Sequence, residues 1–197
     1  LAKKVRGATK LTLKGNMVSE LRKVKNAQEI ELMRKAAEFT SEGMRVAYEA
    51  IAPGVKEYQV AAEIEYVMRK HGSYGTAFET IVASGSYSAF PHGGCSHREI
   101  RKGDLVVVDI GATYKYYRSD MTRTFVAGAA SDRQKQLYAV VKKAQDAALE
   151  AVKPNVKAKA VDAAARKVIA EAGYGENFVH NLGHGVGLEV HEPPILG

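Results

Sequence analysis

The spacing of apolar and polar residues predicts a long helix that begins after Asn26. Asn26 and Glu29 have the spacing of a capping box, in which each residue satisfies a backbone amide of the other. Apolar residues then recur at helical intervals, and Pro53-Gly54 ends the pattern. The residues expected on the buried face are Ile30, Met33, Ala37, Met44, Ala47, Tyr48 and Ile51.

Three further helices and several strands follow from the same pattern. Ser131 and Gln134 form a second capping box, and the helices are predicted over residues 56–71, 131–152 and 158–172. Short apolar runs between turn residues predict strands near Phe78–Ala83, Leu105–Ile110 and Tyr116–Val126. An isolated strand is predicted at residues 10–18, as the end of a preceding domain. The mixture predicts an α+β fold.

Two segments of the chain repeat each other. Residues 46–72 and 147–173, at an offset of 101, are identical at ten of 27 positions, including the proline of the helix break and the terminal glycine. The alternative is that two helix-turn-helix units share common residue types by chance. The repeat favours two helix-helix-strand units related by pseudo-twofold symmetry, with a site between them.

Composition indicates an ordinary globular protein. The chain has 197 residues, of which 46 % are hydrophobic, which suits one domain with a short appendage. It has no apolar run of about 18 residues and no signal-peptide pattern, so we expect a cytoplasmic protein without a membrane partner. The single Cys95 cannot form an intrachain disulfide, and we interpret it as an incidental loop thiol.

The net charge of +7 comes from one end of the chain. Residues 1–25 contain eight basic residues and one acid, Glu20, so residues 26–197 contain 21 of each sign. This basic arm could contact RNA or an anionic surface. It lacks interleaved aromatic residues and any nucleic-acid-binding signature, so a solvated linker is favoured and no nucleic-acid partner is expected.

Asp109, Asp120 and His184 are the candidate metal ligands. Asp109 interrupts the apolar strand Leu105–Ile110, where a buried carboxylate needs a cation or several donors, and an ion pair with a nearby arginine is the alternative. Asp120 precedes Thr122, whose hydroxyl could orient a ligating carboxylate, although one such aspartate alone is more often a surface turn residue. Carboxylate and imidazole groups together suit hydrolytic divalent metal ions.

Histidines next to glycines form the second candidate group. His184 lies between Gly183 and Gly185, where the absence of side chains allows close approach of a ligand or strand. His184 and His191 could chelate a metal with Glu189 and Glu192, although their spacing is not that of a zincin helix. His92 and His191 suit donors to a substrate carbonyl or carboxylate.

Three motifs together carry a family resemblance. They are Asp109-Ile-Gly, Ser119-Asp-Met-Thr-Arg-Thr-Phe125 and His180-Asn-Leu-Gly-His-Gly-Val-Gly-Leu-Glu-Val-His-Glu-Pro-Pro194. With the entry segment Leu21–Ile30 they resemble the pita-bread metallopeptidases, and most of all the Xaa-Pro peptidases, prolidase and aminopeptidase P. The resemblance covers about residues 20–197, and its pseudo-twofold fold agrees with the internal repeat.

The resemblance implies a site with two divalent ions, Mn, Co, Zn or Fe. Asp109, Asp120 and His184 would be ligands, and His92 and His191 would bind substrate and stabilise the transition state. The expected reaction is hydrolysis of the peptide bond before proline in a di- or oligopeptide, with the metals acting as Lewis acids. The resemblance also implies a homodimer for the full-length protein.

Two glutamate ligands of the family match no residue of this sequence. By the offset of the repeat they belong to a hairpin near positions 210–221, so we expect a C-terminally truncated pita-bread domain at residues 21–197. Residues 1–20 would be a remnant of an N-terminal domain and its basic linker. Activity of these 197 residues alone is therefore not expected to match that of the parent enzyme.

Three other functions compete with the Xaa-Pro peptidase. A methionine aminopeptidase shares the fold, but the motifs around Asp120 and His191 look more like the proline-specific branch. Creatinase, a metal-free relative, is disfavoured by Asp109, Asp120 and His184. A non-catalytic binding module would suit the basic arm, and the retained ligands argue against it.

Overall fold

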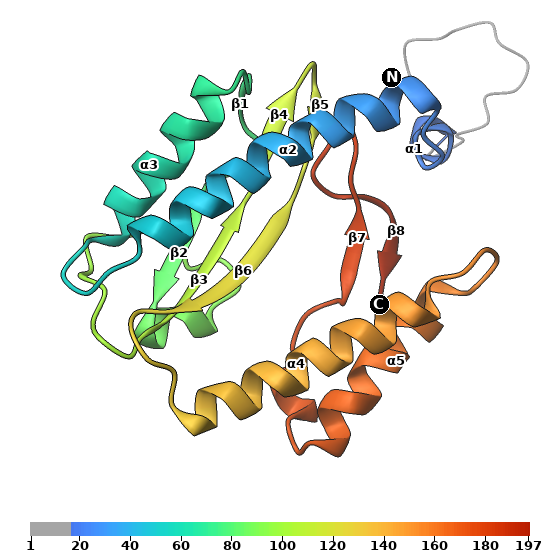
Figure 1. Cartoon of the computed structure of the whole chain (residues 1–197). Coiled ribbons are helices and arrows are strands. Elements are labelled where there is room, and N and C mark those ends of the chain that lie inside the picture. Colours follow the sequence, from blue (N-terminus) through green and yellow to red (C-terminus); the bar gives the residue numbers. More distant parts are fainter. Residues whose placement is uncertain (1–16) are drawn as a thin grey trace, which may run out of the picture.

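The computed structural model describes residues 17–197 and shows a mixture of helices and short antiparallel strands (Figure 1). The helices are α1 (Met17–Arg22), α2 (Ala27–Ala50), α3 (Glu57–Lys70), α4 (Asp132–Ala151), α5 (Ala158–Glu171) and the 3-10 turns η2 (Gly85–Ala89) and η3 (Gly175–Asn177). The strands are β1 (Gly75–Thr76), β2 (Ile81–Ser84), β3 (Leu105–Ile110), β4 (Ala112–Tyr114), β5 (Tyr117–Arg118), β6 (Met121–Val126), β7 (Gly183–Gly185) and β8 (Glu192–Leu196).

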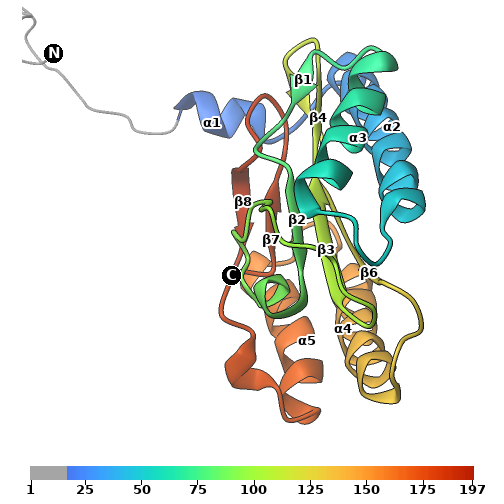
Figure 2. The same cartoon turned by 90° about the vertical axis from the view of Figure 1, so that its left-hand side faces the viewer.

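The central sheet has the order β2-β3-β6, with antiparallel neighbours. Along β3, Val106, Val108 and Ile110 are fully buried and alternate with partly exposed residues, because successive side chains of a strand point to opposite faces. The buried face packs against α2 and α3, and these helices supply much of the main core. Figure 2 shows β7 and β8 on the other side of the sheet.

The predicted capping boxes are confirmed. Asn26 accepts a hydrogen bond from the Glu29 amide and Glu29 accepts one from the Asn26 amide, and Ser131 and Gln134 make the same reciprocal pair. Both helices begin at the next residue. The predicted end of α2 before Pro53 also holds, because the last helical residue is Ala50.

The predicted buried face of α2 is wrong in part. Ile30 and Tyr48 are 45 % and 71 % exposed. The observed stripe instead consists of Ala36, Phe39, Thr40, Gly43, Met44 and Ala47. Small residues belong to it because α2 approaches its neighbours closely: a Cβ at Gly43 would lie 2.9 Å from Cγ of Met68 in α3. A pattern of large apolar residues cannot reveal such a contact.

The strand predicted over Tyr116–Val126 is two strands. Lys115 and Tyr116 have positive φ angles of 44° and 72° and form the turn of the β4–β5 hairpin, and β6 begins afresh at Met121. Turns with two consecutive positive φ angles match the twist of a hairpin. The strand predicted near Phe78–Ala83 is β2, shifted toward Ser84.

The isolated strand predicted at residues 10–18 is wrong at its described end. Met17 and Val18 begin α1, and residues 10–16 lie outside the described part of the chain. The α1 sequence Met-Val-Ser-Glu-Leu-Arg contains the helix-favouring residues Met, Glu, Leu and Arg, which explains the helical turn.

The repeat at an offset of 101 is present in the structure. The bounds of α5 are those of α3 moved by 101 residues. The preceding helices also end alike, with φ and ψ of −70° and 108° at Ile51 and −72° and 107° at Val152. The α4–α5 pair has a small core of its own, formed by Ala144, Ala148, Val161 and Ala165. The fold is therefore α+β with two related helix pairs, as predicted.

None of the helices within residues 17–197 is long and apolar enough to cross a membrane.

Candidate functional site

The β3–β6 pairing places two of the candidate ligands on one face of the sheet. Asp109 in β3 lies opposite Thr122 in β6, and Asp120 is two residues before Thr122. Because side chains alternate along a strand, Asp120 and Thr122 share a face with Asp109. This face is opposite the one that packs against α2 and α3. The sequence spacing of eleven residues is thus that of a hairpin that brings two carboxylates together.

The Asp109 carboxylate is poorly satisfied by protein groups. Its Oδ1 atom is buried and has no hydrogen-bond partner among the described residues. Burial raises the pKa of Asp109; the nearby Thr122 hydroxyl acts in the opposite direction, and the negative charge of Asp120 raises the pKa further. Such a buried oxygen needs a proton or a cation.

His184 contacts Asp120 across the space between the two repeats. Its Nε2 atom lies 3.3 Å from Oδ2 of Asp120, and each side chain is 24 % exposed. The Nδ1 atom lies 3.0 Å from the Gly185 carbonyl oxygen, so a proton on Nδ1 leaves Nε2 free as an acceptor or ligand. The structure therefore brings Asp109, Asp120 and His184 to one region.

His191 joins this region, and His92 lies in the turn after η2. The ring centroids of His191 and His184 are 4.2 Å apart. The side chain of His92 is exposed. The roles of His92 and His191 as substrate donors stay predictions.

A buried hydroxyl pair, which the sequence pattern did not reveal, supports the two aspartates. Thr40 on α2 and Ser119 lie with their hydroxyl oxygens 2.6 Å apart, and the Ala112 amide donates to both. Gly111 sits beside them, where a Cβ would overlap the Ser119 carbonyl oxygen. These contacts fix the backbone just after Asp109 and just before Asp120. The available signal was a threonine within an otherwise apolar helix stripe.

The His184 segment is held by strands and by the β5 hairpin. Gly185 pairs with Glu192 of β8, and a Cβ at Gly185 would lie 2.7 Å from the Pro193 carbonyl oxygen. The Arg118 amide donates to the Gly187 carbonyl oxygen at 2.8 Å. Glycine at Gly185 allows β7 to lie close to the neighbouring strand β8, as the sequence predicted.

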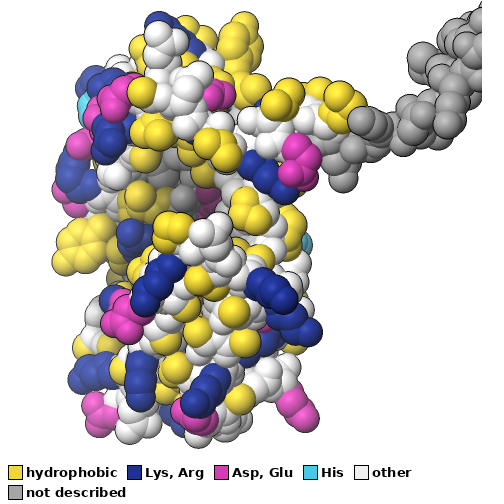
Figure 3. Space-filling view, turned by 90° about the vertical axis from the view of Figure 1, so that its right-hand side faces the viewer, with side chains coloured by type: hydrophobic (Ala, Val, Ile, Leu, Met, Phe, Trp, Pro, Cys, Tyr) yellow, Lys and Arg dark blue, Asp and Glu magenta, His cyan; other side chains and the backbone are white. Residues whose placement is uncertain are grey.

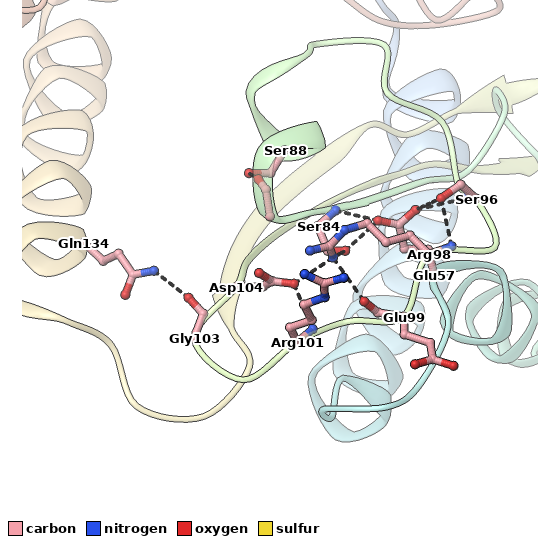
Figure 4. A network of polar contacts seen from close by, with 11 residues as sticks. Glu57, Ser84, Ser88, Ser96, Arg98, Glu99, Arg101, Gly103, Asp104 and Gln134 are labelled. Carbon is pink, nitrogen blue, oxygen red and sulfur yellow. Dashed lines mark hydrogen bonds and ion pairs between the residues drawn. The ribbon is translucent and has the colours of Figure 1, made fainter.

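A second polar network closes the loop that bears His92. The buried carboxylate of Glu57 accepts hydrogen bonds from the amide and hydroxyl of Ser84 and from those of Ser96, at 2.5–3.0 Å (Figure 4). Arg98 donates to Ser84 and pairs with Asp104 at 2.7 Å. Glu57 therefore joins both ends of the loop, although sequence analysis assigned it no role.

The residues present fit a divalent cation in donor chemistry. Two carboxylates and an imidazole converge, and a buried Asp109 oxygen lacks a protein partner. No three His, Cys, Asp or Glu side chains within residues 17–197 surround a single point as ligands of one ion. The contacts are pairwise: His184 lies 3.3 Å from Asp120, and the charge of Asp120 acts on Asp109.

Comparison with known proteins agrees with this geometry. Residues 31–197 match the model of metallopeptidase family M24. The Xaa-Pro dipeptidase of Pyrococcus furiosus is 48 % identical over 181 residues, which are 92 % of this chain and 52 % of that protein. The chain thus spans about half the length of the curated relatives it matches.

Solved structures show the same likeness. Prolidase from Pyrococcus furiosus superimposes with a TM-score of 0.90 at 47 % identity, covering 92 % of this chain and 54 % of that one. X-Pro aminopeptidase from Thermotoga maritima gives 0.89 at 45 % identity, with 92 % and 51 % covered. The fold is therefore the pita-bread fold of these enzymes, and the chain belongs to metallopeptidase family M24, whose members use divalent metal ions.

Proposed function

We propose that this chain forms part of a metal-dependent peptidase that hydrolyses the peptide bond before proline, as an Xaa-Pro dipeptidase or aminopeptidase. The observation that carries the proposal is the contact of Asp120 with His184, next to the unpartnered oxygen of Asp109. These residues come from both repeats and meet at the face of the sheet that α2 and α3 leave uncovered. The names of the matched relatives support proline specificity.

Asp109, Asp120 and His184 are proposed to hold two divalent ions. Bound there, the ions would supply Lewis acidity and a nucleophilic water at neutral pH. Asp120 contacts His184, and its charge acts on Asp109, so the three side chains would serve as one set of ligands. The proton on Nδ1 of His184 stays with the Gly185 carbonyl, which keeps Nε2 available as a ligand.

His191 is proposed to donate to the substrate. It is exposed beside His184, so its ring can face a substrate carbonyl held at the ligands, and a cationic or N–H donor there would stabilise developing negative charge. His92 is proposed for the same role from the loop that Glu57 closes. For His92, the support is the sequence motif.

Peptide hydrolysis by the product of the complete gene tests this function. After removal of metal with EDTA, the protein should cleave an Xaa-Pro dipeptide only when Mn²⁺ or Co²⁺ is returned. The matching Xaa-Ala dipeptide is the control for proline specificity. Cleavage that persists in EDTA, or a preference for peptides beginning with methionine, would contradict the proposal.

Isosteric variants connect that activity to these residues. Asp109→Asn and Asp120→Asn keep the side-chain shape and remove the ligand charge, so each should abolish cleavage together with metal content. His191→Ala should retain metal and lose turnover by about 10²–10³-fold, as expected for a donor to developing charge. Metal analysis of the purified proteins separates the two classes.

A further inference from the structure

The carboxylate of Glu192, close to the candidate site, is buried and surrounded by hydrogen-bond donors. Its side chain is 3 % exposed and pairs with Arg22 and with Lys25, whose Nζ atom is 3.0 Å from Oε2. The Glu189 amide donates to Oε1 at 3.1 Å. Arg22 also reaches Glu189 at 3.4 Å. None of these groups is among the candidate metal ligands, and the function proposed above assigns the cluster no role.

The segment between β7 and β8 is folded around this carboxylate. A Cβ at Gly187 would lie 2.6 Å from Oε2 of Glu192, and the Gly187 amide donates to the Glu189 carbonyl at 3.0 Å. The carboxylate therefore fills the centre of the turn at residues 186–191. Its removal would leave the Glu189 amide, Arg22 and Lys25 without the acceptor that they share.

This turn ends at His191, which directly precedes Glu192 in sequence. The His191 ring is exposed but rests 4.2 Å from the ring of His184. The two cations come from the other end of the described chain. Arg22 is the last residue of α1, and Lys25 precedes Asn26, the N-cap of α2. Figures 1 and 2 both show α1 beside the ends of β7 and β8. The ion pairs thus tie the start of the fold to the turn that presents His191.

We propose that Arg22 and Lys25 are positioning residues, which hold His191 against His184 through the carboxylate of Glu192. The inference deepens the proposed function and rests on it where His191 contacts substrate. The position of the His191 ring relative to the His184 ring can be tested without catalysis. A buried carboxylate that loses one cationic partner leaves an uncompensated charge, so the turn should rearrange when either cation is removed.

Nuclear Overhauser contacts between the two imidazole rings test the geometry in the 197-residue chain. Wild type should show a ring-to-ring contact between His184 and His191. Arg22→Met and Lys25→Met should weaken this contact and broaden the His191 ring signals, and the double variant should abolish it. Lys25→Arg should restore it, because the guanidinium keeps the charge near Glu192.

Lys23→Met is the matched control. Lys23 lies between the two cations in sequence and pairs only with the exposed Glu20 among residues of the described chain, so its removal should leave the ring contact intact. Glu192→Gln is the second test, because it keeps the side-chain volume and an acceptor for the Glu189 amide while removing the charge. An unchanged ring contact in both Glu192→Gln and the double variant would overturn the proposal.

Kinetics of the complete gene product provide the second readout. Arg22→Met should lower kcat for an Xaa-Pro dipeptide by about tenfold, with metal content and the Lys23→Met control unchanged. Equal losses in Lys23→Met would assign the effect to general destabilisation and overturn the positioning role. If no peptide is cleaved by wild type, the proposed function fails, and the ring contact still decides whether the ion pairs position His191.

Discussion

At the scale of single residues, the buried Asp109 carboxylate carries a free-energy cost that a bound cation or a proton would remove. Burial raises its pKa above the usual range, and the charge of Asp120 adds to the rise. A carboxyl whose folded pKa is raised destabilises the folded state at pH values above its unfolded pKa. The metal-free chain should therefore be limited in stability by the same residue that the proposed function requires.

Asp109→Asn is predicted to raise the melting temperature of the metal-free chain at pH 7. The amide carries no charge and can donate to Asp120, so the penalty for burial is reduced. An increase of about 2–4 °C would correspond to roughly 1 kcal/mol. Asp146→Asn on the exposed side of α4 should change the melting temperature little, and a lower value for Asp109→Asn would contradict this account.

The stability contributed by Glu192 is expected to depend on pH in the opposite direction. Although burial acts to raise its pKa, hydrogen bonds from the Glu189 amide, Lys25 and Arg22 hold the pKa at about 2, below the usual value of 4.5. Its stabilising contribution is therefore complete above pH 4.5 and is lost as the pH falls toward 2. The free energy of unfolding, measured with denaturant across this pH range, should fall more steeply with decreasing pH in wild type than in Glu192→Gln. Equal slopes in the two proteins would contradict the stabilising role of the Glu192 charge.

Glu57→Gln is predicted to destabilise the loop that bears His92. The amide would present donors to the amide and hydroxyl of Ser84 or Ser96, and each mismatched buried group costs about 1–3 kcal/mol. Glu57 is 2 % exposed, so water cannot replace the lost bonds. Hydrogen exchange should accelerate in residues 84–98 of this variant, while the exposed control Glu63→Gln should leave exchange there unchanged.

At the scale of elements, the sequence predicted well those helices and strands whose signals are local. Local signals are sufficient to place these elements, because each acts within a few residues. Examples are the capping residues Asn26 and Ser131 and the apolar run of β3. The buried face of α2 was mispredicted because Thr40 and Gly43 are buried by contacts with β-strand and α3 residues far away in sequence. Local periodicity carries no information about such partners.

Gly111→Ala is predicted to disrupt the hairpin more than its size suggests. The new methyl group would overlap the Ser119 carbonyl oxygen and lie 2.8 Å from the Phe78 ring, so β4 would move relative to the segment before Asp120. Overpacking of this kind typically costs about 1–3 kcal/mol. Gly54→Ala, at a position without neighbours within 4 Å, controls for glycine replacement generally, although its positive φ of 91° adds local strain.

At the scale of the whole molecule, the internal repeat explains why the candidate ligands meet. Asp109 and Asp120 follow the first helix pair, and His184 follows the second, so only the packing of the two repeats can bring Asp120 and His184 to 3.3 Å. The sequence could identify the repeat and the residue types. It could not place His92 and His191 relative to the ligands, because their loops depend on partners far away in sequence. Glu57 joins the ends of the His92 loop, and Arg22 and Lys25 pair with the carboxylate in the His191 turn.

The surface of the chain also retains apolar side chains. Tyr138, Val141, Leu149 and Val152 of the α4 region are each more than half exposed, and Figure 3 shows hydrophobic side chains among Lys and Arg on one side of the molecule. Exposed apolar patches favour association. We expect the 197-residue chain to self-associate, and light scattering should show a mass above 21.4 kDa that decreases on dilution. A constant monomer mass at all concentrations would contradict this expectation.

Calorimetric titration of the 197-residue chain with Mn²⁺ or Co²⁺ tests the central claim, that Asp109, Asp120 and His184 form the metal site. Because no three ligands surround one point in the described chain, we predict weak, saturable binding. Asp120→Asn should weaken it at least about tenfold, or 1.4 kcal/mol, whereas Asp146→Asn should not. Equal affinities of wild type and Asp120→Asn, or tight binding of two ions that survives this substitution, would contradict the account.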